Sequence, residues 1–282
     1  MHLHTLAECI SLACLFEATA PKPGNVHRGA DFADLSFLDL TVSGVVVAPH
    51  LARAAELGVG AAAWQAMQAT QRVIATNSNL GIVLLLAPLA AVPREEPLPA
   101  GVQQVLQQLT PQDSLYLWRT IQAAKAGGLG QVPEHDVAGT APQHILPAMQ
   151  LAADRDLIAA QYVNGFKHVF EHVVPWLVAG CQQGWSLTTS IIHTHVQMMA
   201  EFPDSLIARK RGREVAQQAA HIARQVLQSG PPEDENYQAA LADFDFWLRA
   251  DGHQRNPGTT ADMLAAGLFV ILRDALVAPP YR

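Results

Sequence analysis

Apolar residues recur with the helical period in every long segment of this 282-residue chain, and runs that alternate polar with apolar residues are absent. Hydrophobic residues make up 50% of the chain and are mainly Ala, Leu and Val, which suits packed helices better than sheets. The pattern predicts an all-α fold of about a dozen helices. No internal repeat or low-complexity tail is found, so we expect one compact domain over residues 1–282.

The longest apolar run, Leu80 to Val92, predicts a helix buried in the core. It is too short to span a bilayer, which needs about 20 residues. The N-terminus lacks the basic region of a signal peptide. The three cysteines, Cys9, Cys14 and Cys181, have no CxxC spacing, which favours a reducing compartment. We therefore expect a cytoplasmic protein without a membrane partner.

The charge balance narrows the choice of ligands. The net charge of −7 argues against a nucleic-acid-binding domain, which would usually carry a basic patch. Charged residues make up only 15% of the chain, so we expect some surface to be buried against another subunit, as in a homodimer. An anionic ligand must then be held by local clusters of the few basic residues.

A rigid, charged loop follows the first predicted helix, residues 3–19. In Pro21-Lys22-Pro23-Gly24, two prolines fix the backbone around Lys22, and Gly24 permits a turn or a close approach that a side chain would block. Mixed charge on a rigid loop is what a phosphate and metal site needs, although most loops of this composition are simply solvated. The candidate ligands in this loop are Lys22, Gly24, Asn25, Arg28 and Asp34.

Four polar residues stand directly before the predicted core helix, in Thr76-Asn77-Ser78-Asn79-Leu80-Gly81. Such a cluster is typical of a helix N-cap, and capping is the simplest interpretation. A cap needs only one side chain, however, so Asn77 and Asn79 retain hydrogen-bonding capacity. Because the N-terminus of a buried helix also attracts anions, both residues are candidates for a nucleotide contact.

The most basic stretch of the chain follows Asp204, at Arg209-Lys210-Arg211-Gly212-Arg213. One interpretation is a solvated helix face. The other is a polyphosphate site, because arginine suits bidentate phosphate contacts and cations are otherwise scarce here. Asp204 lies one turn before the cluster and can either cap the helix or hold a cation.

A second Pro-Gly loop precedes the last predicted helix, in Asn256-Pro257-Gly258-Thr259-Thr260-Ala261-Asp262. Thr259 or Thr260 is expected to cap this helix, with Asp262 in its first turn. Capping alone could explain these residues. The first charged loop has the same design, which favours a site shared by the two loops.

Two further groups of acidic residues allow more than one interpretation. Glu17 lies in the last turn of the first helix, where the helix dipole disfavours a carboxylate, so it faces a metal or Lys22 or is simply exposed. Residues 126–147 form the longest irregular segment and contain Glu134-His135-Asp136. Neighbouring residues on a loop rarely all bind one ion, so we interpret this segment as a candidate lid.

These motifs, in their order, resemble the triphosphoribosyl-dephospho-CoA synthase family over nearly the whole chain. Pro21-Lys22-Pro23-Gly24 resembles the family's PKPG motif, and Asn77 with Gly81 matches its N-T-H-K-G motif. Asp204 and the basic turn after it resemble the G-D-T-N-V segment. Asn256 to Leu264 resembles the S-P-G-G-S-A-D-L-L motif.

The resemblance implies a transferase that uses ATP as a sugar donor. A hydroxyl of a coenzyme-type acceptor attacks C1 of the ATP ribose, adenine leaves, and the triphosphate stays on the transferred ribose. Mg²⁺ and cationic side chains would hold the phosphates. On this basis Lys22, Arg209, Lys210 and Arg211 are assigned to the phosphates, and Asn77 and Asn79 to the ribose or base. The candidates for binding magnesium or activating the acceptor are Asp34, Asp204 and Asp262.

The chain also departs from the family pattern. The histidine and lysine of the N-T-H-K-G motif are Asn79 and Leu80 here, and the family's G-A-R-G-E-A segment is replaced by residues 130–136, which lack the arginine. The acceptor could therefore be dephospho-CoA or another cofactor precursor, such as a methanopterin-type intermediate. Two alternatives are a Mg²⁺-dependent nucleotide hydrolase and a non-catalytic nucleotide-binding protein.

Overall fold

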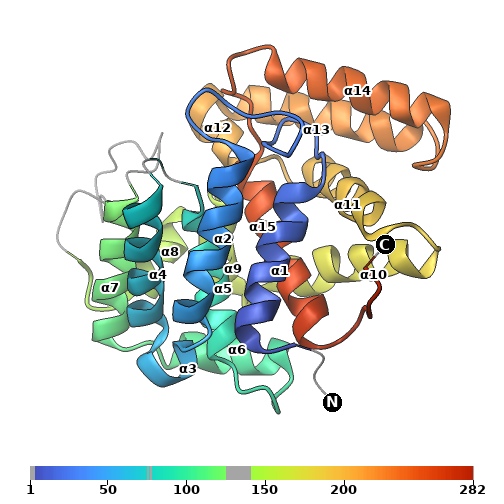
Figure 1. Cartoon of the computed structure of the whole chain (residues 1–282). Coiled ribbons are helices and arrows are strands. Elements are labelled where there is room, and N and C mark those ends of the chain that lie inside the picture. Colours follow the sequence, from blue (N-terminus) through green and yellow to red (C-terminus); the bar gives the residue numbers. More distant parts are fainter. Residues whose placement is uncertain (1–3, 75, 77, 125–140, 282) are drawn as a thin grey trace.

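The computed structural model describes residues 4–74, 76, 78–124 and 141–281, and every structural statement below concerns these residues. Its regular elements are fifteen α-helices and one π-helical turn, with no strand, which confirms the predicted all-α fold (Figure 1). The helices are α1 (Leu6–Thr19), α2 (Phe37–Leu51), α3 (Ala54–Leu57), α4 (Val59–Val73), α5 (Leu80–Ala91), α6 (Leu98–Gln107), α7 (Pro111–Ala123), α8 (Ile145–Ala152), α9 (Leu157–Asn164), α10 (Val174–Gln182), α11 (Leu187–Glu201), α12 (Ser205–Arg211), α13 (Arg213–Gln228), α14 (Glu235–Arg249) and α15 (Gly258–Arg273). The π-helical turn is Val169–Val173.

Helices α15 and α5 occupy the centre of the main hydrophobic core. Nearly every residue of α15 is buried, and this helix contacts α1, α5, α10 and α11 (Figure 1). Helix α5 is buried continuously from Ile82 to Ala90. A helix enclosed on all sides has no need of a polar face, which explains its uniformly apolar sequence and confirms the predicted core helix.

A second, smaller cluster joins α11, α12, α13 and α14 around buried residues such as Ile207, Tyr237 and Phe244. Helices α13 and α14 lie side by side at one edge of the molecule (Figure 1). The short basic helix α12 contacts both α13 and α15. It therefore stands where the two clusters meet.

Side-chain caps and one glycine set several helix boundaries. Ser36 caps α2 and Thr110 caps α7, each in a capping box with an aspartate three residues later. Helix α9 ends at Gly165, which adopts the left-handed conformation (φ +69°) before the π-helical turn.

The predicted irregular segment 126–147 is only partly described. Its last residues belong to α8, so the irregular segment ends earlier than predicted. The candidate lid residues Glu134, His135 and Asp136 lie outside the described residues.

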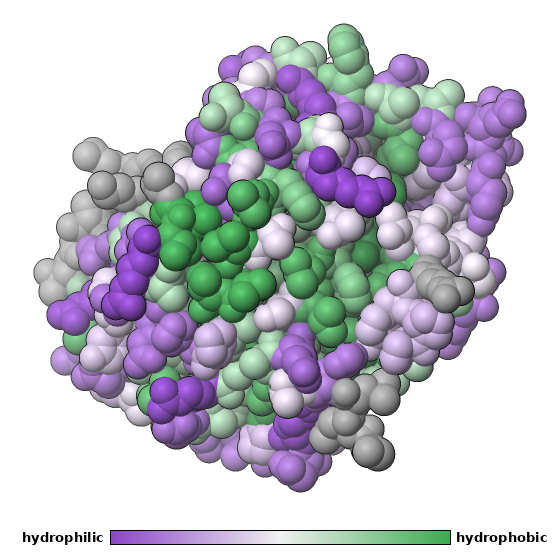
Figure 2. All heavy atoms as spheres, in the orientation of Figure 1, coloured by the Kyte–Doolittle hydropathy of each residue, from purple (hydrophilic) through white to green (hydrophobic). Residues whose placement is uncertain are grey.

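Apolar side chains gather on the face of the molecule formed by α2 (Figure 2). On this helix Leu38 is 67% exposed and Val45 is 51% exposed. Exposed apolar surface of this kind is typical of a site of protein contact. The expected homodimer stays a prediction. Among the described helices, none combines the length and hydrophobicity needed to cross a membrane.

Candidate functional site

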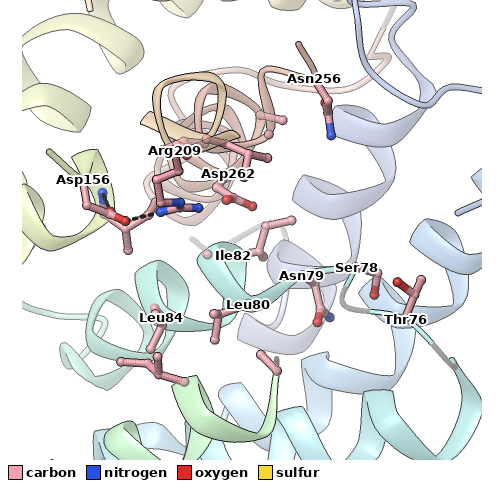
Figure 3. A pocket seen from close by; sticks show the side chains of 18 of the residues that line it. Thr76, Ser78, Asn79, Leu80, Ile82, Leu84, Asp156, Arg209, Asn256 and Asp262 are labelled. Atoms are coloured by element: carbon pink, nitrogen blue, oxygen red, sulfur yellow. Dashed lines mark hydrogen bonds and ion pairs between the residues drawn. The ribbon is translucent and has the colours of Figure 1, made fainter. Parts of the chain in front are cut away.

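A cavity of about 1050 Å³ is lined by residues that lie between Glu17 and Asp262 in the sequence. Its lining comes from the end of α1, the first charged loop, α4, α7, α8 and the first residues of α5, α9 and α15. One part of the lining is polar and carries Arg209 and Asp262 (Figure 3). Another part is apolar and includes Met67, Trp118 and Met149. A cavity of this size and mixed character suits a ligand with both charged and flat or apolar parts.

Three helices begin at the wall of the cavity. Helices α5, α9 and α15 begin at Leu80, Leu157 and Gly258, and the cavity is lined by residues of the first turn of each. Backbone N–H groups and the positive end of the helix dipole attract an anion to such a terminus. In α9 and α15 this place is taken by the protein's own carboxylates, since Asp156 and Asp204 accept first-turn N–H groups there. The start of α5 has no side-chain cap, so it is the terminus that favours an anionic ligand.

The start of α15 corrects the predicted caps. Its N-cap position is Pro257, which has no side-chain cap, and neither Thr259 nor Thr260 caps the helix. Asp262 lies beyond the first turn. The side chain of Thr260 instead donates to Asp204 over 2.8 Å, and Ser205 donates to Thr259 over 3.1 Å. The threonines thus join α15 to α12.

Asp204 is a buried connector between these two helices. Its carboxylate accepts hydrogen bonds from the backbone of Leu206 and Ile207, which caps α12, and from the backbone and hydroxyl of Thr260. Burial raises the pKa of Asp204, and these hydrogen bonds oppose that shift. The side chain is 1% exposed and does not line the cavity. Its position does not support the predicted catalytic or metal-binding role and confirms the capping alternative.

We predict that Asp204→Ala lowers the free energy of unfolding by about 3 kcal/mol, because four donors lose a charged acceptor inside the protein. Asp234 is a matched control, since it caps α14 with a single hydrogen bond to Asn236. Its replacement by alanine should cost about 1 kcal/mol. Urea denaturation of both variants measures the difference, and equal losses would contradict the connecting role.

The three predicted cations of α12 separate into two groups. Arg209 lines the cavity and forms an ion pair with Asp156, the N-cap of α9 (Figure 3). Lys210 also lines the cavity; partial burial lowers its pKa, while the nearby Asp34 carboxylate opposes the shift. Arg211 forms an exposed ion pair with Asp251 at 3.0 Å and does not line the cavity. The structure therefore brings Arg209 and Lys210 to the site and leaves Arg211 outside it.

Asp262 is the carboxylate that faces the cavity from α15, beside Arg209 in Figure 3. Burial raises its pKa well above the usual value, and the charges of Glu17 and Asp204 add to the shift. A carboxyl group with a raised pKa can hold a proton at neutral pH and donate it. Asp262 is therefore a candidate acid within the site.

Gly81 explains how Asp262 is accommodated. A Cβ atom at position 81 would lie 2.0 Å from Oδ2 of Asp262, far inside contact distance. Because the carboxylate sits at the end of a short side chain, a larger residue at position 81 could be accepted only by turning the carboxylate away. The glycine therefore leaves the space that the Asp262 carboxylate occupies.

We predict that Gly81→Ala lowers kcat/KM by about tenfold or more, because a shift of about 1 Å in the candidate acid Asp262 is enough for such a loss. The unfolding temperature should change little, since alanine is the better helix former. Steady-state kinetics and thermal denaturation separate the two effects. Full activity in this variant would show that the position of Asp262 is unimportant.

Lys22, the predicted phosphate ligand of the first loop, lies inside the protein. It is 0% exposed, does not line the cavity, and forms an ion pair with Glu17 at 2.9 Å. Its ammonium also donates to the backbone carbonyls of Glu17 and Ala20. The Lys22 side chain thus supports Glu17, which does line the cavity, and of the three interpretations of Glu17 the contact with Lys22 is confirmed.

The remaining residues of the first loop divide in the same way. Asn25 and Asp34 line the cavity, whereas Gly24 and Arg28 do not. Gly24 has φ +75°, and a Cβ there would meet Leu248 and Pro257 at 2.9 Å, so the predicted turn and close approach are both present. Nδ2 of Asn25 donates to Oδ1 of Asn256 over 3.0 Å. This bond joins the two Pro-Gly loops, as their shared design suggested.

Asn79 occupies the N-cap position of α5, but its side chain does not cap the helix. Its amide donates to Thr70 of α4 over 3.1 Å instead, and both residues line the cavity. Asn77, the other predicted nucleotide contact, lies outside the described residues.

Arg155 and Asp156 also line the cavity, although neither is among the candidate site residues predicted from the sequence. The signal that could have identified Asp156 is its place directly before the apolar Leu157-Ile158-Ala159, which is typical of an N-cap.

A preformed metal cage is not found: within the described ranges no group of three or more His, Cys, Asp or Glu residues could hold an ion. Asp34 and Asp262 both line the cavity, and neither forms an ion pair with another described residue. Mg²⁺ in nucleotide sites is usually held by one or two carboxylates together with substrate phosphates. The donor set fits a metal that arrives with its nucleotide.

Comparison with known proteins gives a consistent result. The model of a family described as ATP:dephospho-CoA triphosphoribosyl transferase matches residues 3–279. A crystal structure from Archaeoglobus fulgidus, provisionally described as a triphosphoribosyl-dephospho-CoA synthase, superposes with a TM-score of 0.61 and 21% identity over 85% of this chain and 99% of that chain. At this identity the likeness concerns the fold alone. No curated protein matches the chain.

Proposed function

Because the chain belongs to the ATP:dephospho-CoA triphosphoribosyl transferase family, we propose that the cavity is the site where ATP and dephospho-CoA react. The observation that carries this proposal is that Arg209, Lys210 and the uncapped start of α5 line one cavity. A triphosphate needs several donors and positive groups at once. The apolar part offers room for the rest of the two substrates.

The triphosphate of ATP would lie between α12 and the first turns of α5 and α15. Arg209 presents its guanidinium there while Asp156 holds one edge of it. Lys210 adds a second positive charge at the exposed rim of the cavity. Cations held in place before the substrate arrives stabilise charge without reorganisation, which is the main source of such catalysis.

Asp262 is proposed to protonate the departing adenine. In the transfer, the bond between C1 of ribose and the adenine nitrogen breaks while the acceptor oxygen bonds to C1. The adenine gains a proton and the acceptor hydroxyl loses one. Asp262, with its raised pKa, can supply the first proton, and Glu17 is a second cavity-lining carboxylate that can take the other.

Mg²⁺ is proposed to enter with the triphosphate, and Asp34 at the cavity rim is the carboxylate placed to hold it beside Lys210. When bound, the ion would neutralise phosphate charge. Removal of Mg²⁺ should therefore weaken ATP binding rather than unfold the protein.

The proposal is tested by incubating the full-length chain with ATP, Mg²⁺ and dephospho-CoA and following free adenine by chromatography. Adenine should appear only when the acceptor is present. Release of phosphate without adenine would instead indicate a nucleotide hydrolase, and ATP binding without turnover would indicate a non-catalytic protein. The cytoplasmic location, the homodimer and the alternative acceptors remain predictions.

A further inference from the structure

The orientation of the Asn79 amide is fixed by its partner. Nδ2 of Asn79 donates to Oγ1 of Thr70 over 3.1 Å, and the Thr70 hydroxyl donates to the Ala66 carbonyl over 3.3 Å. Since the single hydroxyl proton of Thr70 is already engaged, its oxygen can only accept from Asn79. The amide oxygen of Asn79 must therefore point away from Thr70.

That oxygen is left without a hydrogen-bond partner among the described residues. Asn79 is 4% exposed, so water cannot readily donate a hydrogen bond to this oxygen. A buried acceptor without a partner lowers the stability of the fold by about 1–3 kcal/mol. Asn79 and Thr70 both line the cavity. A ligand in the cavity can supply the missing donor.

The surroundings of Asn79 indicate which donor fits. Met67 and Ile74, the C-cap residue of α4, lie about one turn to either side of Thr70 and line the same cavity. A phosphate has no proton-bearing donor at neutral pH to offer this oxygen, and the cations of the cavity come from other elements (Figure 3). A flat heteroaromatic ring with an exocyclic amine combines an apolar face with a group that only donates.

We propose that Oδ1 of Asn79 accepts a hydrogen bond from the 6-amino group of an adenine ring and so selects adenine over 6-oxopurines. The inference rests on the proposed function, in which both ATP and dephospho-CoA carry this ring. A 6-oxo group would place an acceptor against an acceptor, and sites built for one substrate N–H reject analogues that lack it. The two sources of the ring are separated by the experiment.

Binding of ATP and ITP to the full-length chain, measured by calorimetric titration, tests the first source. ITP differs from ATP in carrying a 6-oxo group. The wild type should favour ATP by about tenfold or more, and Asn79→Leu should reduce the ratio to about twofold or less. A parallel titration compares dephospho-CoA with its inosine counterpart. A lower preference for the adenine compound in Asn79→Leu than in the wild type, in either series, supports the inference. Equal preferences in the variant and the wild type in both series would overturn it.

A second pair of variants keeps the test valid if Asn79→Leu does not fold. Thr70→Val removes the anchor of the amide and should also lower the ratio, because the Asn79 side chain can then turn. Thr120→Val is the matched control: Thr120 is buried on α7, donates to the carbonyl four residues earlier, and does not line the cavity. If Thr70→Val and Thr120→Val both keep the wild-type ratio, the inference fails.

These titrations require no turnover, so the inference and the proposed function can fail separately. A wild type that releases no adenine, while discrimination against 6-oxopurines still depends on Asn79, would contradict the transfer reaction alone. Adenine release together with Asn79-independent discrimination would contradict the inference alone.

Discussion

Arg209→Ala is expected to lower kcat/KM for ATP by about 100-fold or more. The guanidinium is held by Asp156 at the cavity wall, so its loss removes a positioned cation and leaves Asp156 as an unpaired negative charge near the triphosphate. The kcat/KM of Arg209→Lys should lie between those of the wild type and of Arg209→Ala, with a loss of about tenfold. Lysine keeps the charge but not the planar pair of donors. Steady-state kinetics with ATP as the varied substrate measures the effect.

Arg211 provides the matched control two residues away. It belongs to the same helix and the same basic run, but its partner is Asp251 and it does not line the cavity. Arg211→Ala should therefore change kcat/KM by no more than about twofold, the effect of an exposed ion pair. If both arginines prove equally important, the basic run acts through its total charge, and the placement of the triphosphate beside Arg209 is wrong.

Asp262→Asn is expected to lower kcat by about 100-fold or more while changing the KM for ATP little. Asparagine keeps the shape of the side chain but cannot donate a proton to the departing adenine, and general acid catalysis of this kind contributes about 10²–10⁴-fold. The dependence of kcat on pH should also change. In the wild type kcat should fall with rising pH as Asp262 loses its proton, and the variant should lack that step.

The same substitution is expected to stabilise the protein at neutral and alkaline pH. Burial raises the pKa of Asp262 in the folded state, so between its unfolded and folded pKa values the folded protein holds one more proton than the unfolded chain. The stability of the wild type therefore falls as pH rises through that window. The asparagine side chain carries no charge and avoids this loss.

Thermal denaturation at about pH 4, near the ordinary pKa of an aspartate, and at about pH 8 measures the linkage. The unfolding temperature of Asp262→Asn should exceed that of the wild type at the higher pH, and the gap should shrink at the lower one. A gap that is equal at both values would mean that the carboxyl group does not change its ionisation in this range.

The fold followed from the sequence because its signals are local. Ser36, Thr110 and Asp204 directly precede α2, α7 and α12, and each caps its helix as such residues do. The uniformly apolar α5 could only be a central helix. These features depend on neighbours within one turn, which the sequence displays directly.

The site was predictable only in part, because its roles depend on packing between distant segments. Lys22 and Arg209 are both cations in charged motifs, yet one is paired in the interior and the other faces the cavity. The closeness of Gly81 to Asp262 involves two residues far apart in the chain. Asp156 gains its significance from Arg209, and no local pattern in the chain measures that proximity.

Transfer of the whole triphosphoribosyl unit is tested most directly by ATP labelled with ³²P at the γ-phosphate. The full-length chain is incubated with this ATP, Mg²⁺ and dephospho-CoA, and the products are separated by chromatography. The proposed reaction predicts that the label moves onto the acceptor in equal amount to the adenine released. Label found as free phosphate, or left entirely in ATP while dephospho-CoA is unchanged, would contradict it.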